Sequence, residues 1–284
     1  MSVNILKEKL AKGTFFTVPG VHDMIAALMA ERAGFDVVYG SGYWTTASAY
    51  GLPDTGIVTY TQMLDRMSTV KRTIGSALIA DADTGFGGLL NVHHTVKGYE
   101  QAGMAAIQLE DQEFPKKCGH TPGKRVVAIE EMVDKIKVAV EAREEMLIIA
   151  RTDAYQTYGL DETLRRLEAY DKAGADILFP EAVTTEEEMR KVCETFGKPV
   201  LVNIANGGVT PPYPADVLAD LGFAFAIYPS LTSLVSARAM ELALNQLRDH
   251  GIGEPTEPGL FDFKEFCSLV GFEEVWAFDK KWAR

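Results

Sequence analysis

The chain has few cysteines, fewer cationic than acidic residues, and no long apolar run. Its three cysteines are spread over 284 residues and none forms a CxxC pair, so neither a disulfide framework nor a structural zinc site is expected. The balance of 28 Lys and Arg against 40 Asp and Glu argues against a nucleic-acid or anionic-membrane partner. No segment approaches the roughly 18 apolar residues of a membrane span, and no secretion signal is visible. We expect a cytoplasmic protein.

A glycine-rich nucleotide loop is also missing, since neither GxGxxG nor a Walker sequence occurs. What the chain has is a repeating alternation of short β-branched runs with stretches of helical periodicity. The strand candidates lie near Phe15, Val37, Leu78, Ile107, Leu147, Ile177, Val200 and Phe225. The helical stretches cover 22–34, 59–75, 91–103, 129–144, 160–174, 185–197, 214–222 and 230–251. Eight such units predict an α/β protein, a (β/α)8 TIM barrel, rather than an open doubly wound sheet.

The last part of the chain follows eight complete units. Pro255 and Pro258 suggest a hinge, and an aromatic-rich segment with helical spacing comes after them. We expect a catalytic barrel over 1–253 and a C-terminal helical extension over 254–284. The extension is predicted to pack outside the barrel or on a neighbouring subunit.

Polar residues end six successive strand candidates. In a (β/α)8 barrel the carboxyl ends of the strands meet at one mouth, where the active site lies. A single strand-end carboxylate is equally well explained as a helix cap or a rim ion pair. Several converging carboxylates repel one another, so their density at one mouth indicates a reaction site. The residues are Ser41, Gly42, Asp81, Asp83, Glu110, Asp111, Arg151, Asp153, Glu181 and Asn203.

The segment ADADTGFGG carries Asp81 and Asp83, which point the same way on an extended strand. Two carboxylates on one face suit Mg²⁺, which prefers oxygen ligands and keeps several waters. A DxD pair alone is a weak indication, but Glu110 from the next strand strengthens it. Asp54 in GLPDTG could join through water.

Arg151 follows the apolar run LIIA, where an unpaired guanidinium would be costly. One interpretation is a bidentate grip on a substrate carboxylate. The other is a structural ion pair with Glu181 or Asp153, and the two are compatible.

Cys118 stands in EFPKKCGHTPGK, just beyond the fourth strand candidate. Gly119, Pro122 and Gly123 allow this loop to move over the mouth as a lid. The two preceding lysines and His120 are expected to lower the pKa of the thiol. Three roles remain open: an inert exposed cysteine, a covalent nucleophile, or a general acid that protonates a carbanion. The nucleophile role leaves the DxD pair without a use, whereas the proton-donor role uses the whole mouth.

These segments resemble the isocitrate lyase and phosphoenolpyruvate mutase superfamily, in particular its methylisocitrate lyase-like branch. The resemblance rests on KKCGH with EDQ before it, ADADTGFG, GLPDTG, ARTDA, FPEA and the N-I-x-x-x-G-x-T-P segment, from about Gly20 to Gly251. KKCGH looks like the mark of the carbon–carbon lyases, because the mutases and the phosphonate hydrolases carry other residues in that loop.

The resemblance implies a Mg²⁺ or Mn²⁺ enzyme that forms a homotetramer and exchanges its C-terminal helices with a neighbouring subunit. By position it implies a metal site of Asp81, Asp83, Glu110 and Asp54. It implies catalytic roles for Cys118, Arg151, Glu181 and His120. It implies substrate binding by Tyr39, Ser41, Gly42, Lys117, Gly119, Asn203 and Pro229.

The activity implied is a retro-aldol, Claisen-type cleavage of a 2-hydroxy dicarboxylate or tricarboxylate, such as 2,3-dimethylmalate or 2-methylisocitrate. The products would be an α-keto acid, pyruvate or glyoxylate, and a carboxylate protonated by Cys118. The alternatives are an oxaloacetate hydrolase or decarboxylase, a phosphonopyruvate-type enzyme, and a non-catalytic metabolite-binding barrel.

Two departures from the methylisocitrate pattern bear on the substrate. Ala205 and Asn206 stand where Thr and Glu are expected, and Tyr43 and Trp44 stand where small glycines are expected. Fewer polar contacts for a third carboxylate favour a dimethylmalate-like diacid, although Tyr43 and Trp44 could equally pack outside the barrel. Pro229, where the oxaloacetate hydrolases would have Ser, also favours a lyase.

Overall fold

A computed structural model of the chain describes residues 2–121, 123–251 and 253–283. Pro122, one of the residues expected to let the loop move, lies outside the described residues. The chain forms two compact units, Met1–Thr232 and Ser233–Arg284.

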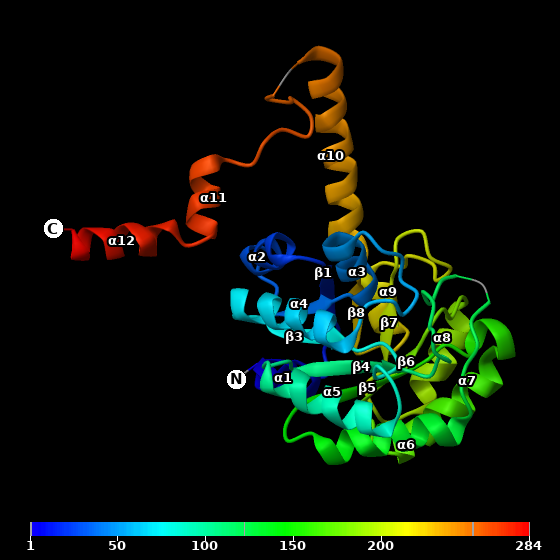
Figure 1. Cartoon of the computed structure of the whole chain (residues 1–284). Helices are drawn as coiled ribbons and strands as arrows, with labels where there is room; N and C mark the ends of the chain where they lie inside the picture. The colour runs from blue at the N-terminus through cyan, green and yellow to red at the C-terminus, as the bar shows by residue number, and fades with distance from the viewer. Residues whose placement is uncertain (1, 122, 252, 284) are drawn as a thin grey trace. The chain divides into compact units, whose positions relative to one another are not determined.

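The first unit is a barrel of parallel strands, as predicted (Figure 1). The strands are β1 (Phe16–Val21), β2 (Val37–Gly40), β3 (Ala77–Asp81), β4 (Ala106–Glu110), β5 (Leu147–Thr152), β6 (Ile177–Pro180), β7 (Leu201–Asn203) and β8 (Phe225–Tyr228). The 8-stranded sheet runs in the order β6-β5-β4-β3-β2-β1-β8-β7. A parallel bridge between Leu178 and Val200 joins its two edge strands, so the barrel closes.

The expected helices of the first unit cover the strands on the outside. They are α2 (Met24–Arg32), α4 (Tyr60–Thr73), α5 (Leu89–Gln101), α6 (Ile129–Ala142), α7 (Tyr155–Lys172), α8 (Glu186–Thr195) and α9 (Ala215–Asp220). Two further helices, α1 (Ser2–Ala11) and α3 (Gly42–Tyr50), were not predicted. Leu6 of α1 is fully buried in the apolar cluster inside the barrel, so this helix closes one end of it.

Strand alternation decides which side chains reach the mouth. On β3, Ala77 and Ile79 face the barrel interior while Leu78 and Ala80 pack toward the helices. Asp81 continues the inward series by the period of two. The same alternation turns Gln108 and Glu110 inward on β4, Arg151 and Asp153 on β5, Glu181 after β6 and Asn203 on β7.

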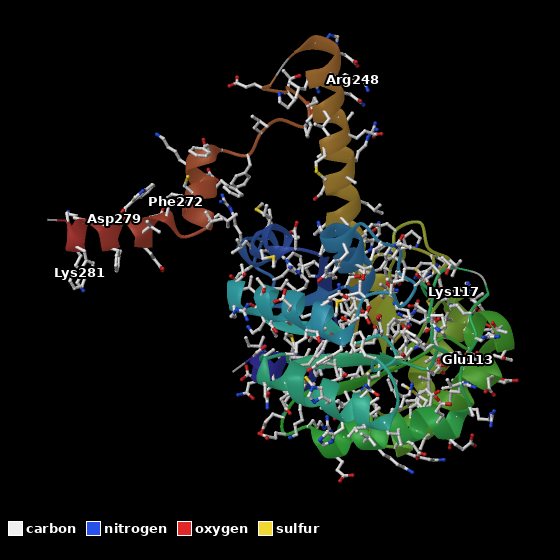
Figure 2. All side chains as sticks on the ribbon, viewed as in Figure 1. Glu113, Lys117, Arg248, Phe272, Asp279 and Lys281 are labelled. Carbon is white, nitrogen blue, oxygen red and sulfur yellow. The ribbon has the colours of Figure 1, made fainter. Side chains whose placement is uncertain are left out.

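The second unit contains the helices α10 (Leu231–His250, of which Ser233 onward belongs to this unit), α11 (Phe263–Leu269) and α12 (Phe272–Trp282). The helical extension expected from the sequence is therefore helical. Its apolar side chains are largely exposed, among them Val235, Leu244, Phe263, Trp276 and Trp282, and Figure 2 shows how the side chains stand out from these helices. Within the described residues, no helix has the length and apolar character needed to cross a bilayer.

Candidate active site

Asp81 is fixed at the end of β3 by hydrogen bonds to both of its carboxylate oxygens. Oδ2 accepts from the backbone N–H of Gly42 at 3.1 Å, and Oδ1 accepts from the backbone N–H of Asp83 at 3.1 Å and from Gln108 Nε2 at 3.3 Å. Position 42 must be glycine because a Cβ there would lie 2.8 Å from Asp81 Oδ2. The N-terminus of α3 thus faces a carboxylate, which its dipole favours.

Tyr39 supports the Asp81 carboxylate indirectly, through Gln108. Its hydroxyl donates to Gln108 Oε1 at 2.8 Å, and Gln108 in turn donates to Asp81. Burial, and after it the charge of Asp81, raises the pKa of Tyr39 well above its ordinary value, so the hydroxyl stays a neutral donor. Tyr39 lies in the predicted site, with its hydroxyl committed to Gln108.

Lys116 occupies the centre of the acidic cluster and was missing from the predicted site. Its Nζ lies 2.5 Å from Asp54 Oδ1 and 2.8 Å from Asp83 Oδ1, and its side chain is 3% exposed. Burial alone would lower the pKa of Lys116, but Asp83, Glu110 and Asp54 outweigh it and raise that pKa. The sequence feature that could have identified Lys116 is its place in KKC, shortly after the acidic end of the fourth strand.

Asp83 lies two residues after Asp81, beyond the end of β3, in a left-handed backbone conformation with φ of 47°, so the extended strand expected for the pair ends at Asp81. Such a conformation costs energy for a residue other than glycine and recurs at functional sites. Burial raises the pKa of Asp83 to about 6, although Lys116 pulls it down. Asp83 is therefore held in a strained backbone conformation and in surroundings that disfavour its charge.

Two buried oxygens of the cluster, Asp83 Oδ1 and Glu110 Oε1, have no hydrogen-bond partner. Lys116 Nζ forms an ion pair with Asp83 Oδ1 at 2.8 Å, so Glu110 Oε1 is the oxygen that is left unpaired. Carboxylate oxygens beside excess negative charge suit a hard divalent cation. Within the described ranges, no three Asp, Glu, His or Cys side chains converge as a complete ligand set. The four predicted metal residues thus gather around Lys116 and fit a cation held by one or two carboxylates with water.

Arg151 is clamped by three carboxylates. Its Nε and Nη2 donate to Asp153 at 2.9 and 3.0 Å, while Nη1 lies 3.3 Å from Glu110 Oε2 and Nη2 lies 3.3 Å from Glu181 Oε2. Of the two compatible interpretations, the structural pair is present. The fork formed by Nε and Nη2 is taken by Asp153, so a bidentate grip on a substrate carboxylate would need the Nη1 side and stays a prediction.

The Cys118 thiol lies beside this clamp. The charges that act on it include those of Asp54, Arg151 and Glu181. Burial raises the pKa of Cys118, with a smaller lowering from a backbone hydrogen bond of His120. The expectation that the flanking cations favour a thiolate was wrong, because Lys116 turns to the carboxylates and Lys117 is exposed.

His120, Asn203 and Glu181 form a connected group beside Arg151. The N–H of Val209 donates to His120 Nδ1 at 3.3 Å, and His120 Nε2 lies 3.5 Å from Glu181 Oε1. Asn203 Nδ2 donates to Glu181 Oε2 at 3.1 Å and lies 3.1 Å from His120 Nε2. Asn203 Oδ1 is buried without a partner, so it is open to a ligand.

The remaining predicted residues divide between the mouth and its support. Ser41 is buried at the start of α3 and makes no side-chain cap bond. Lys117 Nζ donates to the carbonyl of Gly123 at 3.1 Å on the exposed side of the loop, where Figure 2 labels it. Pro229 packs its backbone against Gly20, at which a Cβ would lie 2.4 Å away. Among the described residues, no hydrogen bond or ion pair joins Lys117 or Pro229 to the acidic cluster.

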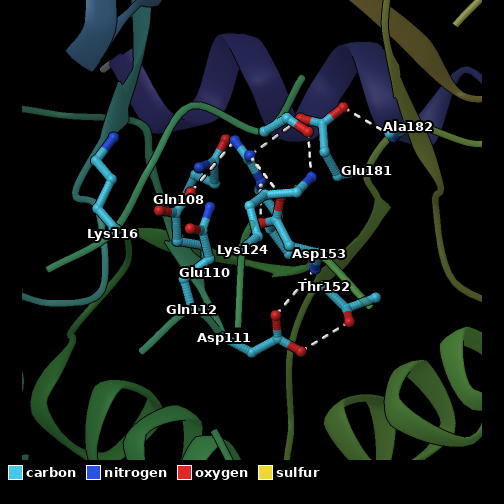
Figure 3. Close-up of polar contacts among 12 residues, drawn as sticks. Gln108, Glu110, Asp111, Gln112, Lys116, Lys124, Thr152, Asp153, Glu181 and Ala182 are labelled. Carbon is cyan, nitrogen blue, oxygen red and sulfur yellow. Dashed lines mark hydrogen bonds and ion pairs between the residues drawn. The ribbon is translucent and has the colours of Figure 1, made fainter. Parts of the chain in front are cut away.

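The sequence suggested that Asp111 faces the mouth. Its side chain points the opposite way (Figure 3). The pleat of β4 turns it outward because Glu110, the preceding residue, points inward. Its Oδ1 accepts from the N–H of Asp153 at 2.9 Å. Its Oδ2 accepts from Thr152 Oγ1 at 2.7 Å, Tyr170 OH at 2.8 Å and Arg166 Nη1 at 3.0 Å. This fully paired carboxylate fixes the end of β5 to α7.

The residues that depart from the methylisocitrate pattern lie in two places. The rings of Tyr43 and Trp44 stack with centroids 4.6 Å apart on α3, and Tyr43 is half exposed and within electrostatic range of Cys118. Asn206 is bound to Ser230, whose hydroxyl accepts from the Asn206 N–H at 2.8 Å and donates to its Oδ1 at 3.0 Å. The Oδ1 atom of Asn206 is therefore already paired.

Comparison with known proteins finds that the family model described as phosphoenolpyruvate phosphomutase matches residues 6–248. A 2,3-dimethylmalate lyase of Eubacterium barkeri is 44% identical over 276 residues, which cover 95% of this chain and 94% of the relative. A 2-methylisocitrate lyase of Bacillus subtilis is 42% identical over 270 residues, covering 94% of this chain and 88% of the relative.

Solved structures show the same fold over the full length. A crystal structure of 2,3-dimethylmalate lyase superposes with a TM-score of 0.93 at 34% identity, covering 100% of this chain and 96% of that chain. Oxaloacetate acetylhydrolase with the inhibitor 3,3-difluorooxalacetate gives 0.93 at 31% identity, covering 99% and 96%. Phosphonopyruvate hydrolase with oxalate and Mg²⁺ gives 0.87 at 30% identity, covering 100% of both chains.

Proposed function

We propose that this chain, which belongs to the phosphoenolpyruvate phosphomutase family within the isocitrate lyase superfamily, is a divalent-metal-dependent carbon–carbon lyase acting on a 2-hydroxy dicarboxylate. The observation that carries the proposal is the Cys118 thiol. Its raised pKa keeps it protonated beside Arg151, at the mouth that holds the acidic cluster. A protonated thiol in this place supports proton donation and leaves an attacking thiolate without support.

Asp81, Asp83 and Glu110, with Asp54 behind Lys116, are the residues that would hold Mg²⁺ or Mn²⁺. When bound there, the cation would lower the pKa of the substrate hydroxyl and stabilise charge on the developing carbonyl oxygen. The unpaired Glu110 Oε1 supports this assignment.

The side chains of the protein would bind the substrate and supply a proton. Arg151 keeps one Nη1 N–H that no carboxylate of the clamp takes, and this N–H would bind a substrate carboxylate. The buried Ser41 hydroxyl, which makes no cap bond at the start of α3 beside Gly42, would hold the carboxylate of the keto acid. In the cleavage the substrate hydroxyl loses its proton to water and becomes the keto oxygen. The electron pair of the broken carbon–carbon bond moves onto the second fragment, whose carbon takes the proton of Cys118. Asn203 and His120, which both contact Glu181, would orient that fragment.

A dimethylmalate-like diacid is the substrate that the distal residues favour. Ala205 offers no hydroxyl, and Asn206 Oδ1 accepts from Ser230. A third carboxylate, as in 2-methylisocitrate, would lack the hydroxyl donor that a Thr at position 205 supplies. The aromatic pair of Tyr43 and Trp44 adds apolar surface at the mouth, which suits methyl groups.

The helical extension supports a homotetramer with exchanged C-terminal helices. Its exposed apolar side chains, such as Trp276 and Trp282, would be costly to leave in water. Light scattering of the purified chain should give the mass of four subunits, and a stable monomer would contradict this assembly. We place the catalytic domain at 1–253, the extension at 254–284, and the enzyme in the cytoplasm.

The activity is tested with purified protein against 2,3-dimethylmalate, 2-methylisocitrate, oxaloacetate and phosphonopyruvate, each with Mg²⁺ and with EDTA. A coupled dehydrogenase reports the keto acid released. The proposal expects turnover of 2,3-dimethylmalate that requires Mg²⁺. Metal-independent turnover, or none on the two hydroxy acids, would contradict it, and ligand binding without product would support a non-catalytic barrel.

A further inference from the structure

We propose that Lys124 is a positioning residue for Cys118, because its buried ammonium ties the backbone beside the thiol to Asp153, the carboxylate that also holds Arg151. This role rests on the proposed function, in which Cys118 is the proton donor. It concerns a residue at the end of the loop that touches neither the acidic cluster nor the substrate carboxylates.

The Lys124 side chain is 2% exposed and binds two partners. Its Nζ donates to the carbonyl of Gly119, the residue after Cys118, and to Asp153 Oδ1 at 3.1 Å (Figure 3). Lysine is seldom buried unless it is paired. Separating the ammonium from Asp153 would leave a buried cation without its counter-charge, so this contact holds the loop in place.

The loop backbone at Gly119 packs directly against Arg151. A Cβ added to Gly119 would lie 2.2 Å from Arg151 Nη2 and 2.9 Å from Glu181 Cγ. Lys124 therefore holds its own loop against Arg151 from one side. Thr121 closes the turn, since its N–H and its hydroxyl donate to the Cys118 carbonyl at 3.0 and 2.8 Å.

Asp153 is a rigid anchor for this contact. Arg151 Nε and Nη2 bind its two carboxylate oxygens at 2.9 and 3.0 Å, and its own N–H donates to Asp111 Oδ1 at 2.9 Å. One carboxylate thus fixes both the guanidinium and the lysine that carries the loop. The thiol and Arg151 are placed relative to each other through Asp153.

The test compares Lys124→Met with Arg125→Met. Arg125 is the next cation along the chain, but it pairs on the surface with Glu113 at 2.7 Å, with side chains 76% and 42% exposed. Two readouts are measured: kcat and KM for 2,3-dimethylmalate with Mg²⁺, and the rate at which iodoacetamide alkylates Cys118, followed by peptide mass spectrometry. Misplacing a reacting group by about 1 Å can cost roughly 100-fold in rate.

For Lys124→Met we expect kcat to fall by about 10- to 100-fold with KM changed by less than about threefold. Alkylation of Cys118 should become at least about tenfold faster, because local opening exposes the thiol. Arg125→Met should stay within about twofold of the natural protein in both readouts. Lys124→Gln, which keeps a donor without the charge, should fall between the two.

Unchanged alkylation in both Lys124 variants would overturn the positioning role, whatever happens to kcat. A lower kcat without faster alkylation would mean that Lys124 acts by another route, which also contradicts the proposal. If the natural protein turned over none of the substrates, the proposed function would fail, while the alkylation rates would still decide whether Lys124 holds the loop. A melting curve for each variant separates local opening from unfolding, and Lys124→Gln replaces Lys124→Met if the latter does not fold.

Discussion

Glu110 and Asp111 are consecutive residues, both buried, yet they belong to two regions with opposite hydrogen bonding. Glu110 faces the mouth, where its Oε1 has no partner and its Oε2 lies 3.3 Å from Arg151 Nη1. Asp111 faces α7, where the Asp153 N–H and three side chains donate to it. Burial raises the pKa of both carboxyls, but only Asp111 has protein donors at both oxygens.

The difference teaches how to separate a catalytic carboxylate from a structural one in this barrel. A buried charge without donors is costly, and it persists where a ligand supplies what the protein does not. A buried charge with a full set of donors stabilises the fold that surrounds it. Changes at the mouth should therefore reduce activity without lowering stability, whereas changes behind it should lower stability more than activity.

The largest expected effect is on activity, from Cys118→Ser at the mouth. A serine hydroxyl donates a proton to carbon far less readily than a thiol, so cleavage should fall by roughly 10²- to 10⁴-fold. Mn²⁺ affinity and the urea midpoint should match those of the natural protein. The measurement is kcat with 2,3-dimethylmalate, and full activity in the variant would remove the proton-donor role.

The second effect is on stability, from Asp111→Asn behind the mouth. An amide accepts fewer hydrogen bonds and leaves Arg166 without its buried carboxylate, so unfolding should require roughly 3–5 kcal/mol less free energy. Urea unfolding at constant temperature measures the loss. Below its melting temperature the variant should keep kcat within about tenfold of the natural value. Normal stability together with abolished turnover would contradict the structural role of Asp111.

The third effect is a pH dependence at the mouth, from Asp83. Its pKa is raised from 3.8 to about 6, so the folded state holds a proton that the unfolded state has released in this range. The stability from this group is full below about pH 3.8 and is lost as pH rises through about 6. Relative to Asp83→Asn, the metal-free natural protein should lose up to about 3 kcal/mol between pH 4 and 7. A difference that is the same at both pH values would contradict the raised pKa.

The smallest effect serves as the control for both regions. Glu168 pairs with Lys172 on the surface of α7 at 2.5 Å, with side chains 60% and 71% exposed. Exposed pairs contribute little, so Glu168→Gln should change the free energy of unfolding by less than about 0.5 kcal/mol and leave kcat unchanged. A loss comparable to that of Asp111→Asn would show that any charge on α7 matters, not the buried one alone.

The sequence predicted the barrel well because strand and helix periodicities are local. The eight strand candidates and the seven barrel helices that were expected agree with the structure. The helix α3 was missed because GYWTTASAY has no amphipathic period, and its start depends on the contact between Gly42 and Asp81. The helix α1 was missed as part of the barrel because its one fully buried residue, Leu6, packs against strands distant in sequence.

The site was predicted less completely, for two physical reasons. The period of two along β4 would have assigned Asp111 to the outer face, but the strand-end rule alone grouped it with Glu110. Lys116 and the pKa of Cys118 depend on burial and on partners such as Asp54, which tertiary contacts create. A loop sequence gives residue types and not the direction in which each side chain points.

The claim that the mouth carboxylates, and not the paired carboxylate behind them, bind the divalent cation is tested by titrating Mn²⁺ into three proteins. Calorimetry or electron paramagnetic resonance would follow the natural chain, Asp83→Asn and Asp111→Asn at a temperature where all three are folded. We expect Asp83→Asn to bind at least about tenfold more weakly and Asp111→Asn to bind like the natural protein. Equal affinity in Asp83→Asn, or lost binding in Asp111→Asn, would contradict this assignment of the two regions.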